Sequence, residues 1–356
     1  MKKFILLGIM ILSFLIQAES LTNQGIKYYK NNDYKRAEEY FLKGIEKNEK
    51  ASFFALGTLY QEQKKYDKAE QMYLKAIENG FGMAAFNNLG YLYYEQGKYD
   101  KAEYMYMKAL EEGDTPFNNL GLLYEKQKKY DKAEQMYLKA IQNGNNAFYN
   151  LGVFYDRQQK YDKAEQIFFK ALEFGDKRAF NNLGYLYYEQ GKYDKAEQMF
   201  LRAVENGNTN AIYNLGYLYY EQGKYNKAEE MYLKAIQNGV PEAFINLANL
   251  YYNQQKYDKA KNLFLIAINY ETLKKTAAQN LFKLSLYYLN KRDLKNGLEL
   301  MSIAAENGNL DAAQILAKTY YKMGEFDEAK KYFKIAANLG DKEAEENYIK
   351  LIKAGY

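Results

Sequence analysis

The sequence has 356 residues, with no Cys, no His and no Trp, but 40 Tyr and 20 Phe. Because His and Cys are absent, the commonest general base, the thiol nucleophile and the softer metal ligands are all missing, so we expect no enzyme, no metal site and no cofactor. The formal net charge is only +5 and no block of like charge occurs, which argues against nucleic acid as a partner.

The first twenty residues resemble a secretory signal peptide. Lys2 and Lys3 precede an apolar run over residues 4–16. Ala18 and Ser20 then occupy the minus-three and minus-one positions of a cleavage site. The apolar run is too short to span a bilayer comfortably. The sequence therefore predicts export to a periplasm or out of the cell, cleavage after Ala18 or Ser20, and no stable membrane insertion afterwards, with an uncleaved anchor as the alternative.

One stretch of the chain occurs twice without change, since residues 85–103 and residues 179–197 both read AFNNLGYLYYEQGKYDKAE. Less similar copies follow one another along nearly all of the remaining chain. Self-similarity at a period of about 20 to 50 residues marks a repeat architecture. We therefore expect stacked copies of one supersecondary unit, stabilised by contacts between neighbours, because no disulfide is available.

Each copy is expected to be a pair of helices. In residues 85–113 the first apolar stripe follows the i, i+3, i+4 and i+7 spacing of a helix face, with Phe86, Leu89, Gly90 and Tyr93. Gly97 interrupts that pattern, and Asp100 followed by Glu103 has the spacing of a capping box at the start of a second helix. Gly113 predicts a left-handed residue after this helix. The unit is thus an antiparallel pair, called helix A and helix B below.

The residues of this unit resemble the tetratricopeptide repeat. The resemblance rests on the spacing L-G-x-x-Y in helix A, G-x-Y at the turn and A-x-x-x-Y-x-x-A in helix B. The first small residue of that helix-B pattern marks ten copies, spaced 31 to 33 residues apart except for a step of 37 before the ninth, at Ala37, Ala69, Ala102, Ala133, Ala164, Ala196, Ala228, Ala260, Gly297 and Ala329. Endings such as AAENGNLDAA at residues 304–313 are similar to Sel1-like repeats, a related family of helix pairs.

The resemblance implies an all-α fold. We expect an α-solenoid of about ten antiparallel helix pairs over residues 21–340, wound as a right-handed superhelix, and a C-terminal capping helix over residues 341–356. Six consecutive A helices keep a Gly, which predicts a close crossing with helix B, where the helix-B Ala is expected to face it. The extra residues within 269–278 are expected either to lengthen a helix or to bend the solenoid.

In this family the A helices line a concave groove, so the resemblance places several positions of each helix A on a candidate ligand surface. The sixth position carries an amide ladder of Asn23, Asn88, Asn119, Asn150, Asn182, Asn214 and Asn246, interrupted by Ala55. The ninth and twelfth positions supply Tyr91, Tyr94, Tyr185, Tyr188, Tyr217, Tyr220 and Tyr252. Amides offer donors and acceptors to an extended peptide backbone, and Tyr adds contact area at low entropic cost. Whether the ladder binds peptide or joins neighbouring helices is left open.

The sequence thus predicts a non-catalytic scaffold of the cell envelope or exterior that binds extended peptide segments of other proteins. A carbohydrate-binding module of the envelope is the alternative, because Tyr rings can also stack on sugars. The amide ladder favours peptide, and the absence of Trp counts against sugar. The sequence indicates no oligomeric state.

Overall fold

The computed structural model describes residues 20–356, so the predicted signal peptide, apart from Ser20, lies outside the described residues. The described part contains 21 α-helices, α2 to α22, and no strand. The even-numbered helices from α2 to α20 are the A helices and the odd-numbered helices from α3 to α21 are the B helices. The prediction of about ten helix pairs followed by one further helix is therefore confirmed. None of the helices in this range is long and apolar enough to cross a bilayer.

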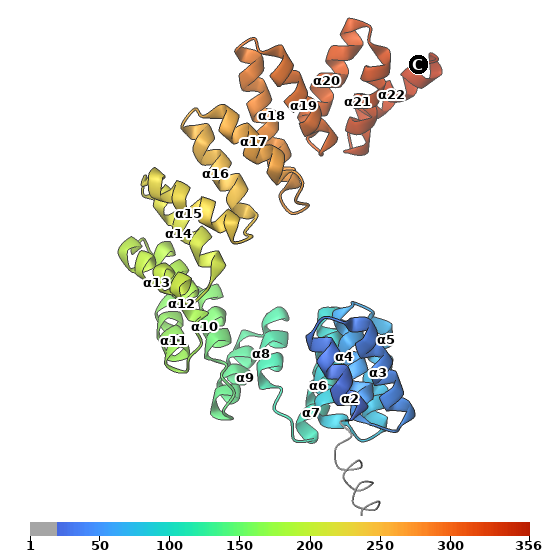
Figure 1. Ribbon diagram of the computed structural model, residues 1–356, viewed down its shortest axis with the longest axis vertical. Coiled ribbons are helices and arrows are strands. Elements are labelled where there is room, and N and C mark those ends of the chain that lie inside the picture. Colours follow the sequence, from blue (N-terminus) through green and yellow to red (C-terminus); the bar gives the residue numbers. More distant parts are fainter. Residues whose placement is uncertain (1–19) are drawn as a thin grey trace, which may run out of the picture. The chain divides into compact units, whose positions relative to one another are not determined.

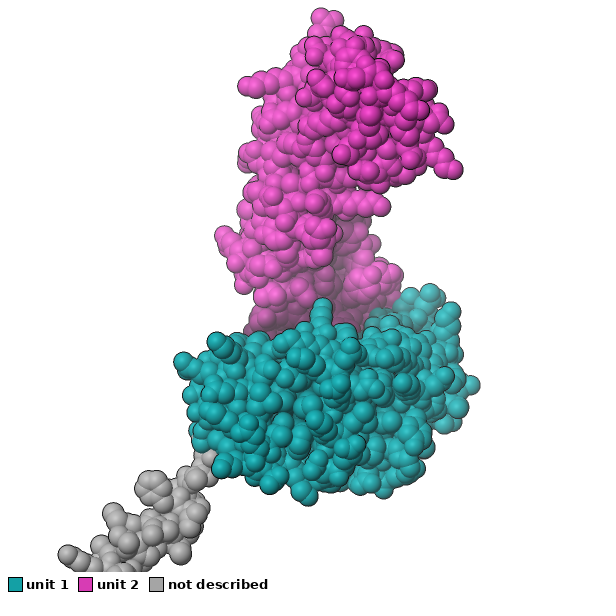
Figure 2. Space-filling view, turned by 90° about the vertical axis from the view of Figure 1, so that its right-hand side faces the viewer, with its two compact units in different colours: residues 1–176 teal, residues 177–356 magenta. Residues whose placement is uncertain are grey.

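The helices and their order along the chain are labelled in Figure 1. The chain divides into two compact units between Asp176 and Lys177 (Figure 2). Unit 1 contains α2 (Leu21–Lys30), α3 (Tyr34–Glu46), α4 (Ala51–Glu62), α5 (Tyr66–Glu78), α6 (Gly82–Glu95), α7 (Tyr99–Glu111), α8 (Phe117–Lys126), α9 (Tyr130–Gln142), α10 (Phe148–Arg157) and α11 (Tyr161–Glu173). Unit 2 contains α12 (Ala179–Glu189), α13 (Tyr193–Glu205), α14 (Thr209–Glu221), α15 (Tyr225–Gln237), α16 (Glu242–Asn253), α17 (Tyr257–Ala267), α18 (Lys274–Asn290), α19 (Leu294–Glu306), α20 (Leu310–Met323), α21 (Phe326–Asn338) and α22 (Lys342–Lys353).

Within each unit, every helix packs against the next helix along the chain. After the first repeat of a unit, each helix A therefore touches helix B of its own repeat and helix B of the repeat before it. The core consists mainly of Ala, Leu and aromatic side chains, and Leu89, Tyr106 and Ala109 are fully buried examples. This sequential packing is the arrangement of an α-solenoid, in which neighbouring repeats stabilise one another.

The helix-A glycines mark the closest approach of the two helices of a repeat. A Cβ atom added to Gly90 would lie 2.7 Å from ring carbon atoms of Tyr106, and one added to Gly184 would lie 2.5 Å from the Phe200 ring. The predicted close crossing is thus present. The facing residue, however, is the aromatic side chain of helix B and not its Ala, because the ring needs the space that a Cβ would occupy.

The predicted capping box at the start of helix B is wrong. Helix α7 begins at Tyr99, its N-cap is Lys98 with no side-chain cap, and Asp100 lies exposed inside the first turn. Glu103 accepts a hydrogen bond from the hydroxyl of Tyr124, at 2.8 Å, in the next repeat. The acidic pair at this spacing therefore serves the helix dipole and an inter-repeat contact.

The irregular segment lengthens a helix, which was one of its two predicted outcomes. Helix α17 ends at Ala267, and α18 then runs for 17 residues, against 10 to 14 in the other A helices.

Gly113 has the predicted left-handed conformation, with φ +89°. At the turn from helix A to helix B, Gly97 also has positive φ, but Lys128 and Gln159 adopt the same conformation without being Gly.

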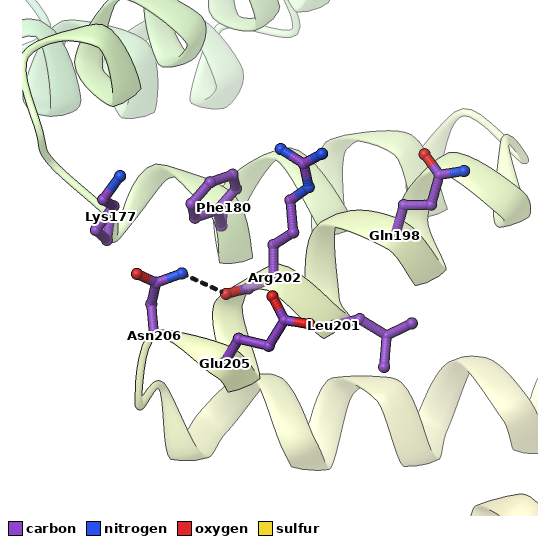
Figure 3. A pocket seen from close by; sticks show the side chains of 7 residues that line it. All are labelled: Lys177, Phe180, Gln198, Leu201, Arg202, Glu205 and Asn206. Atoms are coloured by element: carbon purple, nitrogen blue, oxygen red, sulfur yellow. Dashed lines mark hydrogen bonds between the residues drawn. The ribbon is translucent and has the colours of Figure 1, made fainter.

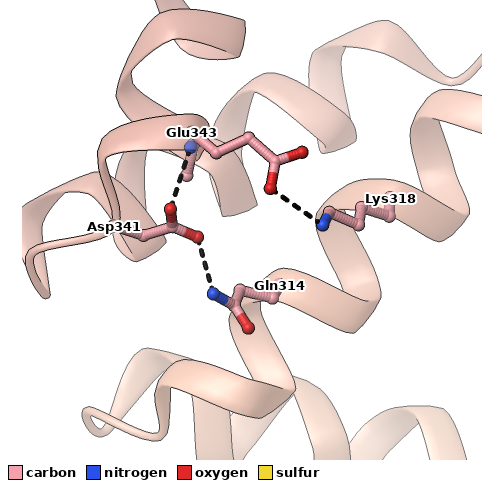
Figure 4. Close-up of polar contacts among 5 residues, drawn as sticks. Gln314, Lys318, Asp341 and Glu343 are labelled. Carbon is pink, nitrogen blue, oxygen red and sulfur yellow. Dashed lines mark hydrogen bonds and ion pairs between the residues drawn. The ribbon is translucent and has the colours of Figure 1, made fainter.

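Helix α22 ends the array with polar contacts to α20 (Figure 4). Asp341 caps α22 by accepting from the Ala344 amide at 3.2 Å, and it also accepts from Gln314 Nε2 at 2.6 Å. Lys318 Nζ lies 3.2 Å from a Glu343 carboxylate oxygen. Ala344 and Leu351 of α22 are buried.

Candidate ligand-binding surface of the A helices

The predicted ligand residues all lie on A helices. Asn88, Tyr91 and Tyr94 come from α6, and Asn119 and Asn150 come from α8 and α10 of unit 1. In unit 2 the contributions are Asn182, Tyr185 and Tyr188 from α12, Asn214, Tyr217 and Tyr220 from α14, and Asn246 and Tyr252 from α16. All six Asn are half-buried. We call the side of each unit that carries these residues its A-helix face.

The ladder amides donate hydrogen bonds to the preceding repeat. Asn119 Nδ2 donates to Asn87 Oδ1 at 2.8 Å, and Asn150 Nδ2 donates to Asn118 Oδ1 at 2.9 Å. In unit 2 the corresponding bonds run from Asn214 to Asn181 Oδ1 and from Asn246 to the Tyr213 hydroxyl, both at 2.9 Å. Asn88 makes a longer bond of 3.4 Å to the Tyr73 hydroxyl. The geometry thus supports the interpretation in which the ladder joins neighbouring helices.

The carbonyl oxygens of three ladder amides are not used in these bonds. In the part of the chain that the structure describes, the Oδ1 atoms of Asn119, Asn150 and Asn214 accept no hydrogen bond. An amide oxygen has two lone pairs and can accept from a peptide N–H. Each of these amides therefore keeps an acceptor, while one of its two N–H groups is used in the bond to the preceding repeat.

The tyrosines of unit 2 form a connected cluster. Tyr185 and Tyr188 have ring centroids 6.3 Å apart, and Tyr188 meets Tyr217 edge-on at 5.7 Å. Tyr185 and Tyr217 are 49% and 39% exposed, so large parts of both rings face solvent. Burial raises the pKa of Tyr188, helped by its hydrogen bond with Tyr217, so its hydroxyl stays neutral. Further along, Asn253 Nδ2 donates to the Tyr220 hydroxyl at 2.8 Å.

In unit 1 the A-helix face carries an ion pair. Tyr91 and Tyr94 stack with ring centroids 6.0 Å apart. Arg157 Nη1 lies 2.8 Å from Glu125 Oε1. Its charge acts on Tyr94, although burial dominates and raises the pKa of that hydroxyl. The A-helix face of unit 1 therefore carries an ion pair as well as tyrosines.

Family comparisons agree with this geometry. Models of the tetratricopeptide repeat match residues 22–80 and 54–118, residues 116–143, residues 145–209 and 177–238, and residues 241–271 and 310–339. The chain is a tetratricopeptide repeat protein. None of the curated proteins matches it.

Several solved structures have a similar fold. Human IFIT1, as a dimer with PPP-AAAA, is 20% identical, and the likeness covers 90% of this chain and 82% of that chain with a TM-score of 0.55. A monomeric mutant of IFIT1 with Gppp-AAAA is 19% identical over 89% and 80%, with a TM-score of 0.54. The c5321 protein of uropathogenic Escherichia coli, a protective antigen with an SLR fold, is 22% identical over 97% and 90%, with a TM-score of 0.35. The likeness to the two IFIT1 structures, at these identities, shows the fold alone.

A recurrent contact between neighbouring tetratricopeptide repeats was missed by sequence reasoning. The Tyr93 hydroxyl of helix A donates to Glu70 of the preceding helix B at 2.7 Å, while Lys98 and Lys101 lie 5.8 and 5.3 Å from the centre of the same ring. The same hydroxyl-to-carboxylate bond joins Tyr60 to Glu38, Tyr124 to Glu103, Tyr155 to Glu134, Tyr219 to Glu197 and Tyr251 to Glu229. The sequence signal for this contact was the repeated string K-Y-D-K-A-E, which contains the two Lys residues beside the ring and, in the preceding repeat, the Glu that accepts the hydrogen bond.

One hollow of unit 2 lies away from the A-helix face. It has a volume of about 620 Å³ and is lined mainly by residues of helix B, among them Leu201, Arg202 and Glu205 (Figure 3). Lys177 and Arg202 both lie within 6 Å of the Phe180 ring, at 5.7 and 5.9 Å. Lys177 and Arg202 thus contact the same ring, and none of these side chains belongs to the ladder or to the Tyr cluster.

Two smaller hollows do lie where A helices meet. An apolar hollow of about 360 Å³ opens beside Ala55, between α2 and α4, with Ile26, Phe54 and Phe81 in its wall. A polar hollow of about 310 Å³ includes Asn119 and four other Asn residues of unit 1. The apolar hollow lies where the amide ladder is interrupted, because Ala is too small to bridge the two helices. No group of three or more carboxylates suited to a metal ion occurs in residues 20–356.

Proposed function

We propose that this protein is an exported, non-catalytic scaffold whose A-helix faces bind extended segments of other proteins. The tetratricopeptide repeat family is one of protein-interaction scaffolds, which supports the general class. The single observation that carries the finer proposal is the exposed Tyr cluster of α12 and α14 beside a row of amide oxygens.

The chemistry of this surface suits a protein ligand. Tyr185 and Tyr217 offer rigid aromatic area, and the Oδ1 atom of Asn214 accepts no hydrogen bond within the described residues. An extended segment has one N–H per residue and can donate to such acceptors irrespective of its sequence. Aromatic anchors with adaptable polar neighbours are typical of surfaces that recognise proteins.

Export is part of the proposal and rests on the leader-like residues 1–20. Sequencing of the mature N-terminus from envelope or medium fractions tests it. A start at Glu19 or Leu21 supports export with cleavage, whereas an intact Met1 or Lys2 start contradicts cleavage.

A pull-down from envelope extract, with the full mature chain as bait, tests the ligand class. The double variant Tyr185→Ser with Tyr217→Ser removes the exposed rings and should lower the recovery of bound protein about tenfold, since aromatic residues dominate many interfaces. Tyr104 is 58% exposed on helix B, so Tyr104→Ser is the matched control and should bind as the parent does. Recovery of glycans without protein would support the carbohydrate alternative instead.

A further inference from the structure

The apolar hollow beside Ala55 has the size and shape of a site for one hydrocarbon chain. Its volume of about 360 Å³ lies within the range of small-ligand pockets, about 300 to 1,000 Å³. It opens between α2 and α4, and the rings of Phe41 from α3 and Phe81 from the loop before α6 complete its wall. A water molecule occupies about 30 Å³ and a methylene group is of similar size, so the hollow has room for about twelve such groups.

The hydroxyl groups in the wall of this hollow are already used as donors. The Thr22 hydroxyl donates to Glu49 Oε2 at 2.5 Å, and the Thr58 hydroxyl donates to a carbonyl of its own helix at 3.2 Å. The Tyr29 hydroxyl donates to Glu62. None of the three is left to pair with the carbonyl groups of a peptide backbone, and a buried backbone group without a partner is costly. The wall therefore favours a ligand with a long apolar part over a protein segment.

The ladder position of this repeat points the same way. Ala55 stands where other repeats carry an Asn, so the amide that could pair with a peptide is missing here. Its small side chain also leaves the space between α2 and α4 open.

One cation lies at the rim of the hollow. Lys30 is the last residue of α2, its side chain is exposed, and it belongs to the lining, which contains no carboxylate. Within residues 20–356 its ammonium group forms no hydrogen bond and no ion pair. An apolar hollow with one unpaired cation at its rim is complementary to an amphiphile that has one hydrocarbon chain and one negative charge.

We propose that this hollow binds a free straight-chain fatty acid of about ten carbon atoms, with its carboxylate beside Lys30. Burial of the chain drives binding, and the ammonium group selects an anionic head. A free fatty acid fits better than a phospholipid, because the hollow has room for one chain and a phospholipid has two. The inference goes beyond the proposed function, since the residues of the Tyr cluster do not line the hollow.

Isothermal titration calorimetry of the full mature chain with a series of sodium alkanoates tests the inference. Decanoate should bind saturably with a Kd below about 1 mM. Each added methylene group should lower the Kd about two- to fourfold, because it removes further apolar surface from water. This gain should stop at about ten to twelve carbon atoms, when the hollow is full. A gain that continues beyond that length would indicate adsorption to the general surface and contradict the inference.

Two substitutions fill the hollow in different ways. Ala55→Leu adds an apolar group, and Ala55→Asn adds the amide that the ladder carries in other repeats. Both should weaken decanoate binding about tenfold or more, since the chain loses the space for several methylene groups, while the helical circular dichroism stays intact. Ala84→Leu is the matched control, because Ala84 is a half-buried residue of α6 that does not line the hollow.

Lys30→Gln tests the position of the head group. The parent should bind octanoate about threefold more tightly than 1-octanol, and Lys30→Gln should remove this preference without changing the binding of 1-octanol. Lys35→Gln is the control, because Lys35 is exposed on α3 and does not line the hollow. If decanoate does not bind, or if it binds both folded Ala55 variants as tightly as the parent, the inference is wrong. It is equally wrong if a peptide with apolar side chains binds in the hollow and decanoate does not.

Discussion

The hydrogen bond between Asn214 and Asn181 provides a direct test of what the amide ladder does. Asn214 Nδ2 donates to Asn181 Oδ1 at 2.9 Å across two repeats of unit 2, and both side chains are half-buried. A net hydrogen bond between neutral groups contributes about 0.5 to 1.5 kcal/mol. We therefore expect Asn214→Ala to lower the free energy of unfolding by about 1 kcal/mol, with little more, because water can reach the acceptor that is left behind.

A double-mutant cycle isolates the pairwise contribution. Asn214→Ala and Asn181→Ala should show a coupling free energy of about 0.5 to 1.5 kcal/mol, because either change alone removes the whole bond. Asn206→Ala is the control, since its amide donates to the Arg202 carbonyl within its own turn. Combined with Asn181→Ala, its effect should be additive.

Two measurements are needed, because neighbouring repeats can unfold separately. Urea unfolding followed by circular dichroism gives the global change, and native-state hydrogen exchange of the α12 and α14 amides gives the local one. A coupling free energy near zero, together with weaker binding of a recovered partner to Asn214→Ala, would show that the amide serves the ligand and not the fold. Unchanged binding with the expected coupling would establish the structural role.

Three further outcomes are expected. Gly184→Ala should lower the free energy of unfolding by about 1 to 3 kcal/mol in urea titrations, because its Cβ would lie 2.5 Å from the Phe200 ring; an increase in stability would show that the crossing is not tight. Lys128→Gly should raise the free energy of unfolding by up to about 1 kcal/mol, because Lys128 has φ +59°. Gly97→Lys, made at the equivalent turn, should lower it. If both variants changed the free energy of unfolding in the same direction, the backbone argument would be contradicted. Burial and a neighbouring carboxylate raise the pKa of Tyr60, Tyr124 and Tyr251 from 10.0 to about 12. The unfolded chain therefore loses these protons first, and the free energy of unfolding should fall between about pH 10 and pH 12. Thermal melting across that range checks the sign, and a variant with all three Tyr changed to Phe should show a shallower fall.

Much of the fold could be predicted from the sequence, because its determinants are local and repeated. The apolar spacing around Leu89 and Tyr93 is enough to specify helix A. Gly113 marks the end of helix B, because it takes a left-handed backbone conformation that Gly adopts most easily. Ten copies of that pattern then require stacking, since one helix pair cannot bury its own apolar face. The same periodicity placed the candidate Asn and Tyr residues on the A helices.

Tertiary structure alone decided how those side chains are paired. Glu103 has capping spacing with Asp100, yet its partner is Tyr124 in the next repeat, and the ladder amide of Asn119 donates to Asn87, 32 residues away. Such pairings depend on the distance and angle between stacked helices, which a local pattern does not encode.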